Sequence, residues 1–283
     1  MVSSVNPFLD EIIRWANSRP DISALIMTGS RAQPEGAVDD LSDYDLEIFT
    51  TNPSSCTSSD LWMSDIAGVW VYLATTRNGL CETRLVVFEG GAKVDFSIRP
   101  VDSLEDMVRC RKLDELYERG YRVLIDKKGL ASQLPSSSYS PPHRPLPTKA
   151  EFEAAVDEFW FEASHIPKYL KRDDLWVVKF RDWTMKELLL QMLEWRAIAA
   201  NRDVKHIGVR MKDWIPADDW HRLNEAFGRF DAADSWRALL AMLSLFRDVA
   251  LETANELGYR YPADRDASIS GYIQGFRDSP FAS

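Results

Sequence analysis

Three aspartates in the N-terminal half have a spacing that could bind a divalent metal ion. Asp43 and Asp45 are separated by one residue at the start of an alternating polar and apolar run, DYDLEIFT. Because strand residues two apart point the same way, with Cα atoms about 7 Å apart, both carboxylates can converge on a hard cation such as Mg²⁺. Asp95 stands in a second alternating run, KVDFSI. If the two strands are neighbours, the mutual repulsion of the three carboxylates would be severe without such a cation.

A possible phosphate-binding turn precedes these carboxylates. Gly29-Ser30-Arg31 follows an apolar run, as a turn after a buried strand would. Glycine permits close approach of the backbone, and amide groups at a strand-to-helix turn can hold a phosphate. Ser42 adds a hydroxyl next to the acidic pair. Two metal ions about 4 Å apart could then hold a nucleoside triphosphate and activate an attacking hydroxyl.

Each of these features has a plainer interpretation when it is taken alone. A Gly-Ser pair is most often only a turn, and Asp-x-Asp is common in a chain with 44 acidic residues. Asp95 could be a solvated strand residue. Their order along the chain, a turn after a strand, then an acidic pair, then a third acid on a later strand, is what favours nucleotide chemistry.

The elements that must position these residues follow from hydrophobic periodicity. Strands are expected over 23–30 and 43–50, and the segment 83–98 is expected to form two strands joined by a tight turn at Gly90-Gly91. A helix containing Phe8, Ile12 and Trp15 precedes them and ends before Pro20. Strands with one apolar face predict a mixed sheet with helices on one side, whose opposite face is free for chemistry.

The second half of the chain predicts helices only. Residues 132–147 are dense in Pro and Ser and are the best linker candidate. Thr148 and Glu151 have the spacing of a capping box, helical patterns follow over 175–200, 217–228 and 233–257, and Gly258 suits a helix C-cap. The expected fold is therefore α+β. It comprises a catalytic domain at 1–131, the linker, and a C-terminal α-helical bundle domain for substrate binding at 148–283.

Composition narrows the class of protein. With 34 Lys and Arg against 44 Asp and Glu, the formal net charge is −10, which argues against a general nucleic-acid partner. It is compatible with a cationic small molecule. No apolar run approaches the roughly 18 residues of a membrane span, and the N-terminus lacks the pattern of a signal peptide. Three scattered cysteines fit a reducing cytoplasm.

The motifs together resemble a known family. GSR at 29–31, DDLSDYDLEIF at 39–49 and KVDFSI at 93–98 resemble the polymerase-beta-like nucleotidyltransferase superfamily. More closely, they resemble the aminoglycoside 6-adenylyltransferases, also called streptomycin adenylyltransferases. In the second half, EFWFEASHIPKYLKRDDLW at 158–176, MLEWR at 192–196 and GYRYP at 258–262 are similar to the helical domain of that family. The resemblance covers most of the chain in the right order.

The resemblance implies a reaction and a set of roles. Members transfer AMP from ATP to a hydroxyl of streptomycin, with release of pyrophosphate. By that likeness Asp43 and Asp45 would ligate Mg²⁺, as two ions, and Asp95 would be the general base, with or without a share in the metal. The triphosphate would be contacted by Gly29, Ser30, Arg31 and Ser42.

Residues of the helical half carry weaker signals. Lys168 and Lys179 match basic positions of the family and could reach the ATP phosphates, or they could lie on a solvated helix face. An acidic and aromatic pocket for the cationic antibiotic could involve Asp182, Trp183, Glu194 and Trp195. Aromatic residues at helical spacing are, however, more often core than pocket.

Two other functions remain open from the sequence. The same chemistry could modify a different small alcohol or a protein side chain, because the acceptor pocket cannot be placed from the sequence. The fold could also serve a catalytically silent nucleotide-binding protein, although all three acids are present. The sequence does not determine the oligomeric state.

Overall fold

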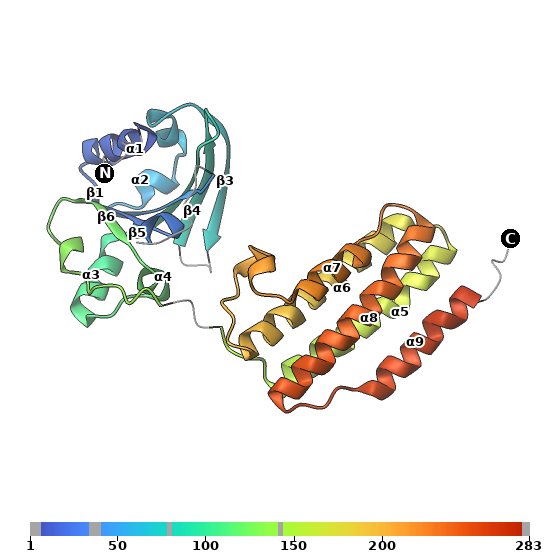
Figure 1. The fold of residues 1–283 in the computed structure, drawn as a ribbon. Helices are drawn as coiled ribbons and strands as arrows, with labels where there is room; N and C mark the ends of the chain where they lie inside the picture. The colour runs from blue at the N-terminus through green and yellow to red at the C-terminus, as the bar shows by residue number, and fades with distance from the viewer. Residues whose placement is uncertain (1–6, 34–40, 78–80, 141–143, 279–283) are drawn as a thin grey trace. The chain divides into compact units, whose positions relative to one another are not determined.

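The structure is a computed structural model that describes residues 7–33, 41–77, 81–140 and 144–278. The chain divides into two compact units, Met1–His143 and Arg144–Ser283 (Figure 1). Each unit has its own hydrophobic core, so each is described by itself. Residues 34–40 and 141–143, parts of the predicted 39–49 motif and of the predicted linker, lie outside the described residues.

A six-stranded mixed sheet forms the first unit, in the order β3-β4-β5-β2-β1-β6. The strands are β1 (Ile22–Thr28), β2 (Tyr44–Thr50), β3 (Val69–Arg77), β4 (Cys81–Phe88), β5 (Lys93–Pro100) and β6 (Arg122–Asp126). β2 and β5 are parallel, and the other neighbours are antiparallel. The two expected acidic strands are therefore adjacent at the centre of the sheet.

One face of this sheet is buried against helices. Period-two alternation sends Leu46, Ile48 and Phe96 to this face, where they pack against Ile12 and Trp15 of α1 (Pro7–Ser18). The short helix α2 (Ser54–Thr57) covers the same face (Figure 1). The predicted hairpin between β4 and β5 is confirmed, with Gly90 and Gly91 at φ 87° and 85°, values that glycine adopts without strain.

The opposite face is covered at one end only. Ile26 and Phe49 point to this face and pack against Leu104 of α3 (Val101–Cys110) and Tyr117 of α4 (Glu115–Glu118). Ala24 and Ile26 of β1 are apolar and point to this face, so they are buried in a second, smaller hydrophobic core. The face expected to be free for chemistry is thus confined to the end that carries Asp43, Asp45 and Asp95.

The strand β3 was not predicted from the sequence. It is one of the two edge strands of the sheet, and large side chains on both of its sides are exposed, including Trp70 at 63 % and Leu73 at 60 %. Since neither face is buried, β3 lacks the one-sided apolar pattern on which the other assignments relied.

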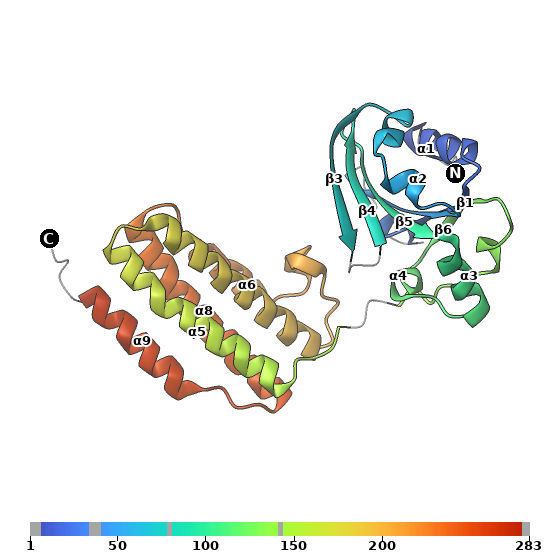
Figure 2. The same ribbon diagram turned by 180° about the vertical axis from the view of Figure 1, so that it is seen from behind.

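The described residues of the second unit form five α-helices, and Figure 2 shows α5, α6, α8 and α9 lying lengthwise beside one another. They are α5 (Lys149–Lys171), α6 (Leu175–Ala199), α7 (Ala217–Ala226), α8 (Ala232–Leu257) and α9 (Ala263–Asp278). The capping box of Thr148 and Glu151 and the C-cap at Gly258 are confirmed. Phe159 of α5 stacks on Phe246 of α8 with ring centroids 3.5 Å apart. No described helix is both long enough and apolar enough to cross a membrane.

The first part of the predicted linker lies against the first unit. Leu134 is buried, the Tyr121 hydroxyl donates to the Pro135 carbonyl, and the Ser137 hydroxyl donates to the Glu118 carbonyl. The assignment of catalysis to one unit and substrate binding to the other stays a prediction.

A buried ion pair fixes the central strands to α4. Glu47 of β2 is 4 % exposed, and its Oε2 lies 3.0 Å from Arg99 Nη1 of β5 and 2.9 Å from the Tyr117 hydroxyl. Arg99 also reaches Asp114, the N-cap of α4, at 3.0 Å. Burial raises the pKa of Glu47, while the bonds from Arg99 and Tyr117 oppose that rise.

Replacing Arg99 with Met should therefore cost about 3–5 kcal/mol of unfolding free energy at pH 7, because Glu47 would stay buried without its counter-ion. The pKa of Glu47 is already raised above its value in the unfolded chain, so the folded variant binds a proton more readily and regains stability as the pH falls. Urea unfolding at pH 7 and pH 5 should show the smaller loss at pH 5. The double variant Glu47→Leu/Arg99→Met should lose less than Arg99→Met alone, and an equal loss would contradict this account.

Candidate active site

The parallel pairing of β2 and β5 brings the predicted acids together. Asp45 is the register partner of Asp95, and adjacent strands lie about 4.8 Å apart. Asp43 stands directly before β2, two residues from Asp45. All three side chains are partly exposed. The sequence-based condition that the two acidic strands be neighbours is met.

Lys93, the first residue of β5, bridges two of these carboxylates. Its Nζ lies 2.5 Å from Asp43 Oδ2, 3.3 Å from Asp95 Oδ1 and 3.5 Å from Asp95 Oδ2. Partial burial alone would lower the pKa of Lys93, but pairing with Asp43 and Asp95 raises it above its ordinary value. The ammonium is therefore held in the charged form between Asp43 and Asp95.

One carboxylate oxygen of this group has no hydrogen-bond donor. Asp95 Oδ1 is buried and accepts no hydrogen bond, although Lys93 Nζ lies at ion-pair distance from it. A buried charged oxygen without a hydrogen-bond donor is costly, and a cation would satisfy it. Within the described parts of the chain, no three His, Cys, Asp or Glu side chains are grouped as a ready metal site. The donor set thus fits a divalent metal in its chemistry, while the arrangement holds an ammonium.

Gly29 makes room for Asp45. Thr28 at the end of β1 pairs with Asp45, and the next residue, Gly29, has φ 68° and ψ −157°, a region that is essentially restricted to glycine. A Cβ at position 29 would lie 1.9 Å from Asp45 Oδ2. The predicted Gly-Ser turn therefore borders the acidic group, and Ser30 follows it in an exposed position.

Arg31 supports the entry to β2. Its guanidinium donates to the carbonyl oxygens of Ser42 and Asp43 and lies over the Tyr44 ring, 4.2 Å from the centroid. These contacts fix the backbone that carries Asp43. A contact from Arg31 or Ser42 to a nucleotide, predicted from the sequence, stays a prediction.

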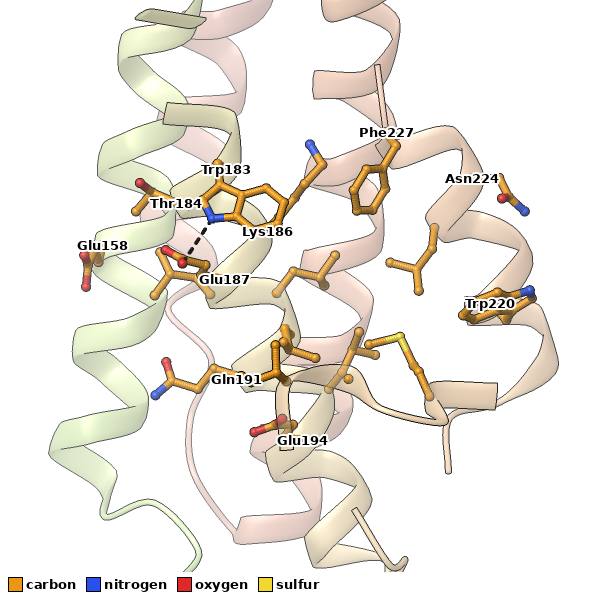
Figure 3. A pocket seen from close by; sticks show the side chains of 18 residues that line it. Glu158, Trp183, Thr184, Lys186, Glu187, Gln191, Glu194, Trp220, Asn224 and Phe227 are labelled. Carbon is orange, nitrogen blue, oxygen red and sulfur yellow. Dashed lines mark hydrogen bonds between the residues drawn. The ribbon is translucent and has the colours of Figure 1, made fainter. Parts of the chain in front are cut away.

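The second unit contains a pocket of about 870 Å³ between α6 and α7. Figure 3 shows Trp183 and Glu187 of α6 on one side and Trp220 and Phe227 on the other. The Trp183 indole nitrogen donates to Glu187 at 3.1 Å. Among the described lining residues the charged side chains are Glu158, Lys186, Glu187 and Glu194. Three carboxylates against one ammonium make the lining acidic.

The predicted pocket residues divide into two groups. Trp183 and Glu194 line the pocket, and their contact with an antibiotic stays a prediction. Asp182 is not a lining residue, and its carboxylate pairs with Nζ of Lys186, which is one, at 2.5 Å. Trp195 packs against the helical core. Amphipathic spacing alone could not separate these positions, since neighbouring residues on α6 face different surroundings.

The two predicted nucleotide-binding lysines of the second unit have local partners. Lys179 Nζ donates to the Gly228 carbonyl at 3.1 Å. Lys168, near the end of α5, has its Nζ 6.0 Å from the centroid of the Tyr272 ring. Their contacts with ATP phosphates stay predictions.

Sequence reasoning assigned no role to two cations. Lys93 could have been found, because it lies two residues before Asp95 on the same strand face. Lys186 gave no signal: it is a buried lysine in an apolar stretch of α6, where burial lowers its pKa and Asp182 opposes that shift.

Comparison with known proteins gives consistent matches over almost the whole chain. A family model described as streptomycin adenylyltransferase matches residues 3–276. The aminoglycoside 6-adenylyltransferase of Campylobacter jejuni is 25 % identical over 279 residues, which cover 93 % of this chain and 92 % of that protein. The enzyme of the same name from Bacillus subtilis (strain 168) is 24 % identical over 284 residues, covering 96 % and 97 %.

One solved structure is also similar. The crystal structure of an aminoglycoside 6-adenyltransferase from Bacillus subtilis aligns with 98 % of this chain and 100 % of its own, with 20 % sequence identity and a TM-score of 0.47.

Replacing Gly29 with Ala should destabilise the first unit by about 1–3 kcal/mol, because the new methyl group meets the Asp45 carboxylate at a backbone conformation that alanine avoids. Gly91→Ala is the matched control: φ is also positive there, but nothing lies within 4 Å of the added Cβ. Urea unfolding of both variants should show the larger loss for Gly29→Ala. Equal losses would mean that the approach of Gly29 to Asp45 contributes nothing.

Proposed function

The chain belongs to the streptomycin adenylyltransferase family, and from that premise we propose that it transfers AMP from ATP to a hydroxyl of an aminoglycoside, releasing pyrophosphate. The 6-hydroxyl of streptomycin is the acceptor we favour. The observation that carries the proposal is the register of β2 and β5, which sets Asp45 opposite Asp95 with Asp43 two residues away. We assign the reaction to the cytoplasm, where ATP is available.

We propose Mg²⁺, as two ions, for the acidic group of Asp43, Asp45 and Asp95. Carboxylate oxygens are the ligands that Mg²⁺ prefers, and the unsatisfied Asp95 Oδ1 supports a cation there. When bound, the metal supplies charge neutralisation for the phosphates and activation of the acceptor hydroxyl.

Asp95 is proposed as the general base. Its carboxylate would take the proton of the acceptor hydroxyl as that oxygen forms a bond to the α-phosphorus of ATP. The bond from the α-phosphorus to the oxygen bridging to the β-phosphorus breaks, and its electron pair leaves with pyrophosphate. General-base help contributes about 10²–10⁴ in rate.

For the nucleotide, we propose that the triphosphate lies over Gly29 and Ser30. The missing side chain at Gly29 leaves the Asp45 carboxylate accessible, and the exposed Ser30 offers a hydroxyl beside it. Ser42 lies at the entry to β2, where Arg31 fixes the backbone by bonds to the Ser42 and Asp43 carbonyls. Arg31 therefore acts chiefly through the position of Asp43.

For the acceptor, we propose the pocket of the helical unit. Streptomycin carries guanidinium groups, which pair with carboxylates and stack on aromatic faces. The Trp183 side chain is 59 % exposed, and Glu187 accepts a bond from its indole nitrogen (Figure 3). An exposed indole and a carboxylate therefore lie side by side, which supports binding of a guanidinium here. Asp182 would act through Lys186, whose charge it balances.

Asp45→Asn and Asp95→Asn should each lower the rate of pyrophosphate release by at least about 10²-fold, because one removes a metal ligand and the other the base. The assay combines ATP, Mg²⁺ and a panel of aminoglycosides. Glu105→Gln, an exposed acidic residue on α3, is the control and should keep the rate of the unchanged enzyme.

Two outcomes of this assay would reject the proposal. Full activity of Asp45→Asn would show that the acidic group does not take part in the reaction. No stimulation by any aminoglycoside would reject the acceptor class, and mass spectrometry of AMP added to other alcohols or to a protein would then identify the acceptor.

Trp183→Ala should raise the KM for the aminoglycoside about tenfold and leave the KM for ATP unchanged, since roughly 1–2 kcal/mol of stacking is lost. Trp176→Ala is the control, because Trp176 is on the same helix and 81 % exposed but does not line the pocket. Equal effects of the two variants on KM would exclude the pocket as the acceptor site.

A further inference from the structure

Lys93 occupies the position between the carboxylates that the proposed chemistry requires for a metal ion. Its single ammonium contacts Asp43 Oδ2 at 2.5 Å and both oxygens of Asp95 at 3.3 and 3.5 Å. The three side chains come from the start of β5, the residue before β2, and the β5 position opposite Asp45. The fold therefore provides its own cation at this point.

The need for such a cation follows from the strand register. Asp45 and Asp95 are register partners on one face of the sheet, and Asp43 lies two residues from Asp45, so three like charges start from neighbouring backbone positions and repel each other. An ammonium of charge +1 balances only part of the group. The buried Asp95 Oδ1 has the ammonium at ion-pair distance, 3.3 Å, but accepts no hydrogen bond from it.

Lys93 also has the freedom to leave. Its side chain is 39 % exposed and that of Asp43 is 42 % exposed, so the pair is reached by solvent. The lysine stem is flexible, and its ammonium is a point charge without a fixed bonding geometry. Withdrawal into solvent requires no change in the β2–β5 pairing.

We propose that Lys93 is a built-in counter-ion that holds Asp43 and Asp95 together when no metal is bound and competes directly with the metal for their oxygens. This inference rests on the metal site of the proposed function. A divalent cation that binds both carboxylates must first displace the ammonium, so Lys93 weakens metal binding while it stabilises the metal-free fold. Lys93 is thus a positioning residue that sets the metal affinity of the free enzyme.

The test is a Mn²⁺ titration of the nucleotide-free protein, followed by electron paramagnetic resonance. Lys93→Met should bind Mn²⁺ at least about tenfold more tightly than the unchanged protein, because the competing charge is gone. Lys93→Arg keeps the positive charge and should bind Mn²⁺ as weakly as the unchanged protein. Lys128→Met removes a positive charge from an exposed site of the same unit and should change the Mn²⁺ affinity little.

Thermal unfolding provides a second readout that a merely structural lysine would not give. Without metal, Lys93→Met should unfold at a lower temperature than the unchanged protein, because the carboxylates repel each other. Saturating Mn²⁺ should raise its unfolding temperature by more than it raises that of the unchanged protein. If Lys93→Met does not fold, Lys93→Gln is used in the same two measurements.

The results separate this inference from the proposed function. Unchanged or weaker Mn²⁺ binding in the folded variant overturns the counter-ion role, even if pyrophosphate release proceeds in the unchanged enzyme. An equal gain from Lys93→Met in an Asp43→Asn/Asp95→Asn background, which removes both carboxylate partners of Lys93, would place the gain elsewhere and also overturn it. Tighter binding with no pyrophosphate release from any aminoglycoside would support the inference and reject the proposed acceptor.

Discussion

The parallel pairing of β2 and β5 is the constraint on which the candidate site depends. It fixes Asp45 opposite Asp95 by backbone hydrogen bonds, so the acidic group exists only because the fold holds like charges together. The buried pair of Glu47, two residues after Asp45 on β2, and Arg99, four residues after Asp95 on β5, fastens the same two strands to α4. The strand pairing and the core around the site thus offset the repulsion between the three carboxylates.

Much of this site could be predicted from the sequence, because strand chemistry is local. Period-two alternation identified the shared face of Asp43 and Asp45, and Gly90-Gly91 marked the hairpin that leads into β5. The contact of Lys93 with Asp43 could not be predicted, since it depends on which strand lies beside β5. The exposed edge strand β3 has no apolar side from which it could be predicted. The packing of α3 and α4 over Ile26 and Phe49 depends on tertiary contacts, which the local sequence pattern does not contain.

In the helical unit, the sequence pattern does not distinguish residues that line the pocket from residues that pack in the core. Trp183 and Trp195 look alike in a helical pattern, yet one lines the acidic pocket and the other packs against the core. Asp182 and Lys186 are one turn apart and neutralise each other, which leaves the charge of the pocket to the glutamates. The pocket is formed by side chains from several helices, so the sequence pattern of one helix does not reveal which of its residues line it.

The most direct test of the central claim is the position of Mn²⁺ in crystals grown with a non-hydrolysable ATP analogue, read from anomalous scattering. The account predicts a peak in contact with carboxylate oxygens of Asp43, Asp45 and Asp95, the triphosphate beside Gly29, and Lys93 withdrawn from Asp43. A nucleotide bound with the metal away from these three carboxylates, or with Lys93 still bridging Asp43 and Asp95, would contradict it.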